Sequence, residues 1–180
     1  MRDNQAFNEM MVHTPLCTHK EAQNVLIIGS TTENLKKEAS KHSGNIEFGD
    51  QSILTSKDDK NIDVVVLTDV KIDEMLLANI ERVLNSDGLI AFSTSNFGKD
   101  EDRLKADLEL VGKNFWIAMP YKFGHNTAIL ASKKYHPTAD IILQRSDLLS
   151  DLEYYSTEIH HASFVFPAAQ HKALTGIAKR

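Results

Sequence analysis

Short apolar segments recur along the chain and are separated by stretches with helical spacing. Residues 23–29 (QNVLIIG) form an apolar run that ends at Gly29-Ser30, a pattern typical of a strand buried on both faces of a parallel sheet. Further runs predict strands because they are rich in β-branched or large apolar residues. These runs are residues 46–48 (IEF), 63–67 (DVVVL) and 89–93 (LIAFS).

Helices are expected between these strands. The polar residues 31–34 (TTEN) supply capping side chains for a helix over residues 35–42. Apolar residues at helical spacing predict a second helix over residues 73–84, and residues 99–110 predict a third, charged and amphipathic one. The order of strand, turn and helix at residues 23–42 is the opening half of a βαβ unit.

Two turns are predicted in the second half of the chain. Asp87-Gly88 is expected to turn the chain into the strand at residues 89–93. Residues 115–119 and 127–132 alternate or run apolar on either side of residues 120–126, which predicts a hairpin with its turn in that segment. The last two strands should therefore be antiparallel.

Strands that alternate with helices and end in a hairpin specify the α/β fold class, with an open, doubly wound Rossmann-like sheet that is mostly parallel. In such sheets ligands bind beyond the carboxyl ends of the strands. We therefore expect a site among residues 29–34, Asp50 and residues 68–72. Residues 23–134 form the predicted α/β core, and residues 135–151, which include Pro137, are the predicted linker to a small C-terminal segment.

Composition narrows the classes of function. A chain of 180 residues is expected to form one domain with a real core. A net charge of -5 provides no basic face for nucleic acid. No apolar run approaches the ~20 residues of a membrane span, and Cys17 is the single cysteine. With a polar start (MRDNQAFNE), these features predict a cytoplasmic protein without nucleic-acid or membrane partners.

The two ends of the chain resemble a known family. Residues 154–174 (YYSTEIHHASFVFPAAQHKAL) are similar to the C-terminal signature of the spermidine synthase family, and residues 7–19 (FNEMMVHTPLCTH) are similar to the helix before its first strand. The pairs Lys37-Glu38 and Lys41-His42 match its first crossover helix, and residues 119–133 resemble its substrate hairpin. On this basis residues 1–22 form a leading helix and residues 135–180 the linker and family segment.

The resemblance implies a methyltransferase-type fold and an aminopropyltransferase activity in polyamine biosynthesis. In that family decarboxylated S-adenosylmethionine donates an aminopropyl group to putrescine, so the ligands are a nucleoside and a polyamine and no cofactor is held tightly. The attacking amine must be neutral, which requires acceptors for its proton. The resemblance also allows a homodimer. We expect this chain to lack the family's N-terminal β-rich domain.

The cofactor-binding residues expected from the resemblance are Asn8, Gly29, Glu47 and Asp50. Gly29 alone remains of the family's glycine-rich turn, so side chains would crowd the nucleoside there, and the alternative is an ordinary capped turn. Asp50 matches the adenine-side aspartate. Glu47 lies where a ribose-binding acid is expected, or it is simply an exposed strand glutamate. Asn8 replaces the family's His or Gln.

The catalytic residues expected from the resemblance are Asp69 and Tyr121. Thr68 occupies the slot of the catalytic aspartate and Lys71 that of the second acid, which leaves Asp69 one residue displaced, pointing to the opposite side of an extended segment. Tyr121 retains the hairpin tyrosine. A lysine beside a polyamine site has the wrong charge for a cationic substrate. Ser93 occupies the position of the amine-binding glutamine.

Two classes of function remain open. The chain is either a spermidine synthase-like enzyme with a degraded active site, or an inactive Rossmann-fold binding or partner module derived from that family. A methyltransferase that uses S-adenosylmethionine itself is a weaker third reading, because it too needs the glycine turn. The cluster Glu158, His160, His161 and His171 invites a metal hypothesis, but the resemblance explains the histidine without metal, and we expect no metal site.

Overall fold

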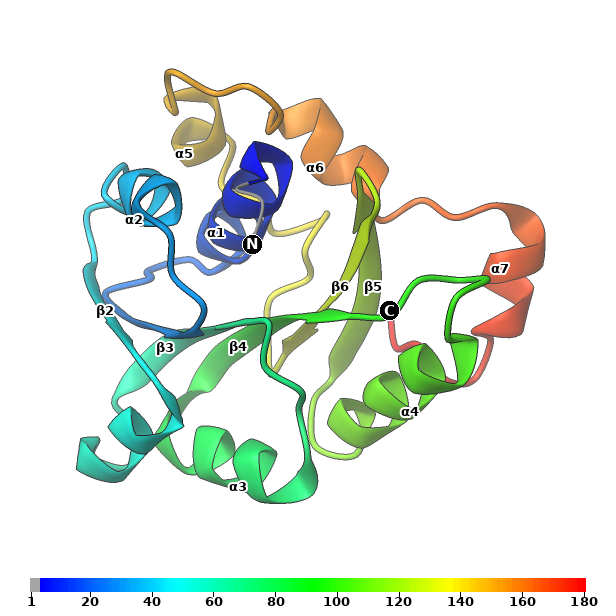
Figure 1. Cartoon of the computed structure of the whole chain (residues 1–180), viewed down its shortest axis with the longest axis horizontal. Helices are drawn as coiled ribbons and strands as arrows, with labels where there is room; N and C mark the ends of the chain where they lie inside the picture. The colour runs from blue at the N-terminus through cyan, green and yellow to red at the C-terminus, as the bar shows by residue number, and fades with distance from the viewer. Residues whose placement is uncertain (1–3) are drawn as a thin grey trace.

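The computed structural model describes residues 4–180, and residues 1–3 of the predicted leading helix lie outside the described part. Six strands form one sheet in the order β2-β1-β3-β4-β6-β5 (Figure 1). β1 to β4 are parallel, whereas β6 pairs antiparallel with both β4 and β5. The strands are β1 Asn24–Gly29, β2 Asn45–Gly49, β3 Ile62–Thr68, β4 Leu84–Thr94, β5 Ile117–Phe123 and β6 Asn126–Ser132.

Helices cover both faces of this sheet. In Figure 1, α1, α2, α5 and α6 lie on one face and α3 and α4 on the other. Two apolar clusters fill the two interfaces, one on each face. This arrangement confirms the predicted doubly wound α/β fold. The helices are α1 Gln5–Thr18, α2 Glu33–Ala39, the 3-10 helix η1 Gln51–Ser56, α3 Glu74–Val83, α4 Glu101–Gly112, α5 Leu143–Asp147, α6 Thr157–Ser163 and α7 Ala168–Ala173.

The predicted turn at Asp87-Gly88 is wrong, because both residues lie inside β4. The strand begins at Leu84, directly after α3, and runs alongside β3. While β3 advances from Ile62 to Val64, its partner advances from Leu84 to Leu89, which is a bulge. The polar residues that suggested a turn are the extra residues of this bulge.

The hairpin is confirmed, but its turn is much shorter than predicted. β5 continues through Pro120 to Phe123, which pairs with Asn126 at the start of β6. Proline is tolerated there because β5 is the edge strand of the sheet, where a missing N–H costs no ladder bond on its outer side. The interpretation of residues 120–126 as a turn was therefore wrong.

The predicted linker contains α5 and is bound to the end of α1. The backbone N–H of Ile142 donates to the carbonyl of Cys17 at 2.8 Å, and the Arg145 guanidinium donates to the carbonyls of Leu16, His19 and Lys20. Further along, α6 and α7 follow the edge of the sheet that β5 forms. Within residues 4–180, no helix is long and apolar enough to cross a membrane.

Candidate functional site

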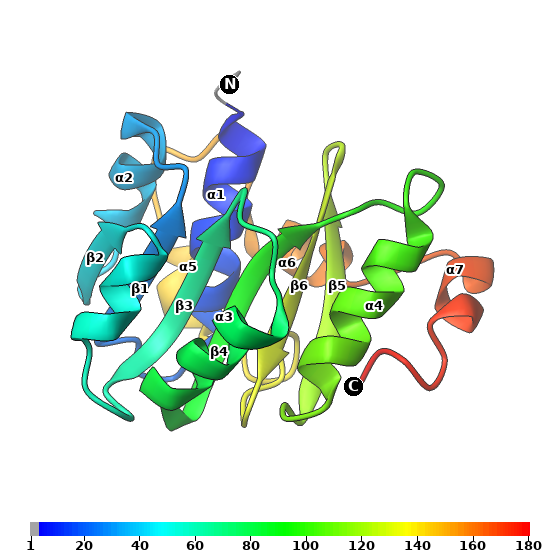
Figure 2. The same cartoon turned by 60° about the horizontal axis from the view of Figure 1, so that its bottom comes forward.

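A polar hollow of about 350 Å³ opens where β3 and β4 end. Figure 2 shows β1, β3 and β4 ending at the same edge, beside the N-terminal end of α1. This is the edge at which ligands bind in sheets of this kind. The hollow is lined by Phe7, Asp69, Val70, Lys71, Ser93, Thr94, Arg103, Asn126 and Thr127.

Asp69 is the one predicted site residue that lines this hollow. Its side chain is exposed and its backbone is left-handed, with φ +56°, a conformation that aspartate tolerates better than most residues. The segment is therefore not extended at Asp69, so the alternation that would turn this side chain away from the site does not apply. Lys71 and Arg103 bring two cations to the same hollow.

The crevice between β1 and β3 is closed by the chain itself. Thr68 is fully buried, and its hydroxyl donates to the Ser30 carbonyl at 2.6 Å, while the Ser30 N–H donates to the Thr68 carbonyl at 3.0 Å. Gly29 has φ +116°, and a Cβ there would lie 2.1 Å from the Thr68 carbonyl oxygen and 2.7 Å from a methyl of Val70. The space that glycine leaves free is occupied by Val70.

Glu47 and Asp50 have local partners and do not line the hollow. Both carboxylate oxygens of Glu47 accept from the Lys57 ammonium at 2.6 Å. Asp50 caps η1 and accepts from the Ser52 hydroxyl at 2.5 Å and the Ser52 N–H at 2.8 Å. These hydrogen bonds hold the pKa of the exposed Asp50 carboxyl below its ordinary value.

Tyr121 and Asn8 are both in the interior. The Tyr121 ring packs against Phe123 and Phe164, and its hydroxyl donates to the sulfur of Met11 at 3.6 Å. Burial alone raises the pKa of Tyr121 well above its ordinary value. Asn8 is 2% exposed on α1. The structure therefore does not bring Tyr121 into the hollow that Asp69 lines.

Sequence reasoning missed the α4 side of the hollow. The Thr94 hydroxyl donates to the Asp107 carboxylate at 2.6 Å, and Arg103 Nε lies 3.7 Å from the same carboxylate. Burial raises the pKa of Asp107 despite these partners. Thr94 ends β4, while Arg103 and Asp107 are one helical turn apart on α4, and this spacing is the signal that could have indicated them.

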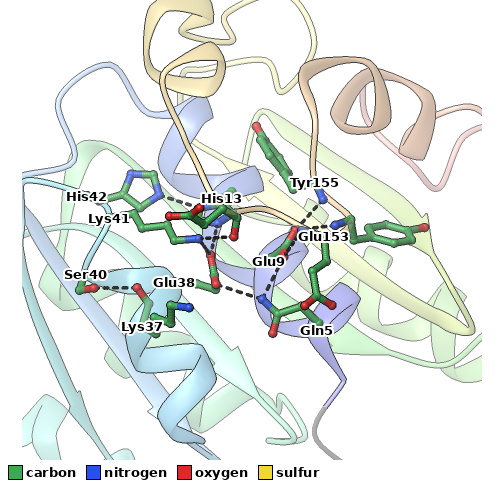
Figure 3. Close-up of polar contacts among 12 residues, drawn as sticks. Gln5, Glu9, His13, Lys37, Glu38, Ser40, Lys41, His42, Glu153 and Tyr155 are labelled. Carbon is green, nitrogen blue, oxygen red and sulfur yellow. Dashed lines mark hydrogen bonds and ion pairs between the residues drawn. The ribbon is translucent and has the colours of Figure 1, made fainter.

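A buried polar network joins the two family-like ends of the chain (Figure 3). The Glu9 carboxylate, fully buried on α1, accepts from the backbone N–H groups of Glu153, Tyr154 and Tyr155 at 2.7–2.8 Å. On the same helix His13 bridges Glu38 at 3.0 Å and His42 at 2.9 Å. The residues that carry the resemblance in α1, α2 and the C-terminal segment thus contact one another.

The His160 ring in the C-terminal segment has a partner on each nitrogen. Nδ1 lies 2.8 Å from the Tyr155 hydroxyl, and Nε2 lies 2.8 Å from the Pro137 carbonyl. Its Glu158, His161 and His171 neighbours in sequence do not form a group of potential metal ligands with it among the described residues. His160 therefore ties the family segment to the stretch at Pro137.

Comparison with known proteins tests the resemblance directly. The model of the "Spermine/spermidine synthase domain" family matches residues 4–76. A polyamine aminopropyltransferase of Helicobacter acinonychis is 26% identical over 192 residues, which cover 89% of this chain and 73% of that protein. These matches confirm the resemblance to the spermidine synthase family. A polyamine aminopropyltransferase of Bacillus cytotoxicus is 22% identical and covers 92% of this chain and 77% of its own length.

Solved structures show the same fold as this chain. Spermidine synthase from Thermotoga maritima superposes with a TM-score of 0.84 at 21% identity, covering 97% of this chain and 76% of that chain. A spermidine synthase in complex with the transition-state analogue AdoDATO gives the same score and identity. An N-methyltransferase from Haemonchus contortus gives 0.52 at 13% identity over 74% of this chain. The sheet is therefore of the methyltransferase type.

Proposed function

We propose that this spermidine synthase relative has a degraded aminopropyl-transfer site, with turnover at least about a hundredfold below that of an intact family enzyme. The reaction joins an amine nitrogen to the carbon next to a sulfonium, breaks the carbon–sulfur bond, releases methylthioadenosine and gives up one amine proton. A positioned proton acceptor contributes about 10²–10⁴-fold to such a step. We propose that the acceptor at the position of Thr68 is lost and that the displaced Asp69 replaces it poorly.

The observation that carries the proposal is the state of Thr68. By resemblance it stands in the slot of the catalytic aspartate, but it is fully buried and its hydroxyl is committed to the Ser30 carbonyl. A hydroxyl is also a far weaker proton acceptor than a carboxylate at neutral pH. Thr68 is therefore too weak a base to take the amine proton, and it does not line the hollow.

The surroundings of the hollow also disfavour the family's substrates. Lys71 and Arg103 would repel a polyamine cation, and Asp69 is the single acidic side chain in the lining of the hollow. Val70 fills the space beside Gly29 where a nucleoside would approach the backbone. Val70 would have to move before decarboxylated S-adenosylmethionine occupies the position that the resemblance implies.

A second candidate is a fully inactive binding or partner module on the same scaffold. The observation in its favour is that the predicted site residues do not converge: Glu47 is paired with Lys57, Asp50 caps η1, and Tyr121 is in the core. The first candidate keeps Asp69 as the proton acceptor and the second does not use it. The two therefore differ in what Asp69→Asn does.

The purified chain should be incubated with decarboxylated S-adenosylmethionine and putrescine, and spermidine and methylthioadenosine quantified by mass spectrometry beside an intact family enzyme. We expect slow, equal formation of both products that falls further in Asp69→Asn. The matched control is Asp58→Asn, an exposed aspartate outside the hollow. Product at background level in every variant favours the binding module, and turnover close to that of the intact enzyme refutes both candidates.

A further inference from the structure

Three side chains from separate elements meet at the end of the sheet opposite the hollow. His19 follows α1, Asp63 lies at the start of β3, and Asp87 lies in the bulge of β4. One ligand atom from each lies within 4.8 Å of the other two. We propose that these three residues form a binding site for a divalent transition-metal ion of the zinc type.

The buried, unpartnered Nε2 of His19 is the observation that points to a missing partner. His19 is 2% exposed, and its Nε2 is buried with no hydrogen-bond partner among the described residues. The nearest carboxylate oxygen is Asp87 Oδ1 at 3.7 Å, beyond hydrogen-bond distance. Buried polar atoms are nearly always satisfied in native proteins, so a buried nitrogen that faces two carboxylates calls for a partner.

The carboxylates are held by outer contacts of the kind that orient metal ligands. Asp63 Oδ2 accepts the backbone N–H groups of Gln23 and Asn24 at 2.9 Å, and Asp63 Oδ1 accepts from the Asn85 amide at 2.6 Å. Asp87 Oδ2 accepts from the Tyr135 hydroxyl at 2.9 Å, which leaves Oδ1 toward His19. Asp63 Oδ1, which accepts one hydrogen bond, and Asp87 Oδ1 each have a lone pair available to a cation.

The donor set selects the class of ion. One imidazole nitrogen with two carboxylates suits zinc and its first-row neighbours better than calcium or magnesium, which prefer oxygen alone. Two cations lie nearby: Arg145 donates to the His19 carbonyl, and Lys134 lies over the Tyr135 ring that packs against His19. Three protein ligands leave a fourth tetrahedral position for water.

Binding requires two small rearrangements. His19 Nδ1 accepts the Glu21 N–H at 3.1 Å, so the ring proton of the neutral imidazole is on Nε2. The metal needs the other tautomer, in which Nδ1 carries the proton and the Glu21 amide loses its acceptor. Ligands about 2.1 Å from zinc lie roughly 3.4 Å apart, so the partly exposed Asp87 must also approach His19.

The test is a calorimetric titration of the untagged, chelator-treated chain with zinc chloride and, separately, with manganese chloride. We expect saturable 1:1 binding of zinc, together with a shift of the Glu21 amide resonance in ¹⁵N-resolved spectra. Asp87→Asn and His19→Gln should each weaken binding at least tenfold. Asp87→Asn keeps an oxygen for Tyr135, and its unfolding transition without metal verifies that it folds.

Matched controls separate this site from weak surface binding. His171→Gln and Asp102→Asn remove an exposed histidine and an exposed aspartate elsewhere, and both should bind zinc as the parent chain does. Absence of 1:1 binding, or binding that survives both Asp87→Asn and His19→Gln, overturns the proposal. The site lies at the far end of the strands from Asp69, so this outcome and that of the aminopropyl-transfer assay are independent.

Discussion

Within residues 4–180, Glu9 is a buried charge without a cationic partner, and backbone N–H groups stabilise it. Burial raises the pKa of this carboxyl, but the N–H groups of Glu153, Tyr155 and Tyr154 outweigh burial and hold the pKa below its ordinary value. Glu9→Gln removes the charge and turns an amide donor toward those N–H groups. We expect the free energy of unfolding at pH 7 to fall by about 2–3 kcal/mol in urea denaturation.

The pH dependence provides a second measurement of the same contact. The pKa of Glu9 is lower in the folded than in the unfolded chain, so its contribution is complete above about pH 4.5 and is lost as the pH falls through the folded-state pKa. Glu9→Gln should therefore flatten the dependence of stability on pH below 4.5. The control is Glu153→Gln, because the exposed Glu153 side chain takes no part in the contact with Glu9, which uses only the Glu153 backbone N–H. An equal loss of stability in that variant would contradict the role given to the Glu9 carboxylate.

Gly29 is a position where only glycine fits. Its φ of +116° and the Thr68 carbonyl 2.1 Å from a built Cβ mean that Gly29→Ala must separate the ends of β1 and β3. We expect a loss of more than about 2 kcal/mol. Gly124→Ala is the control, because its φ is +53° with nothing within 4 Å, and it should lose about 1 kcal/mol. Similar losses in thermal unfolding would refute the role of close packing.

At the scale of elements, Arg145 attaches α5 to the end of α1. Its guanidinium donates to three carbonyls at the end of α1, those of Leu16, His19 and Lys20. The ammonium of lysine cannot reproduce this planar set of hydrogen bonds. We expect Arg145→Lys and Arg145→Met to lower stability by similar amounts, about 1–3 kcal/mol. Hydrogen exchange of the Ile142 amide, which bonds to Cys17, should accelerate in both. Full rescue by lysine would show that charge alone matters.

The sequence predicts the strands and helices better than it predicts the turns and bulges between them. Apolar runs such as residues 63–67 predict the strands, because only a sheet covered on both faces buries every side chain of such a run. Asp87-Gly88 and Pro120 mislead, because a bulge and an edge strand accept residues that usually mark turns.

For the candidate site, the sequence predicts where a residue lies along its strand. It does not predict which side chains that residue contacts. The place of Asp69 after β3 follows from the apolar run before it, and the hollow lies where such sheets bind ligands. The contact of Thr94 with Asp107 depends on how α4 packs beside β4, and the burial of Tyr121 depends on α1 and α6. These are tertiary facts that no local pattern encodes.

At the scale of the whole molecule, residues 151–180 complete both cores. Tyr155 and Phe164 belong to the apolar cluster on the α1 face, while Leu174 belongs to the cluster on the α3 and α4 face. We expect a chain cut after Ser150 to lose its cooperative thermal transition, measured by far-ultraviolet circular dichroism. A truncated chain that still unfolds cooperatively would mean that residues 151–180 are an accessory to an independent core.

The contact of Glu9 with Glu153 also has a consequence for synthesis of the chain. The two residues are 144 positions apart, so α1 leaves the ribosome many seconds before the N–H groups that surround its carboxylate, at a synthesis rate of about 5–20 residues per second. During that interval α1 presents Met10, Met11 and a bare Glu9 without their final cover. The apolar cluster on the α1 face is therefore completed late in synthesis, after residues 153–155 have left the ribosome.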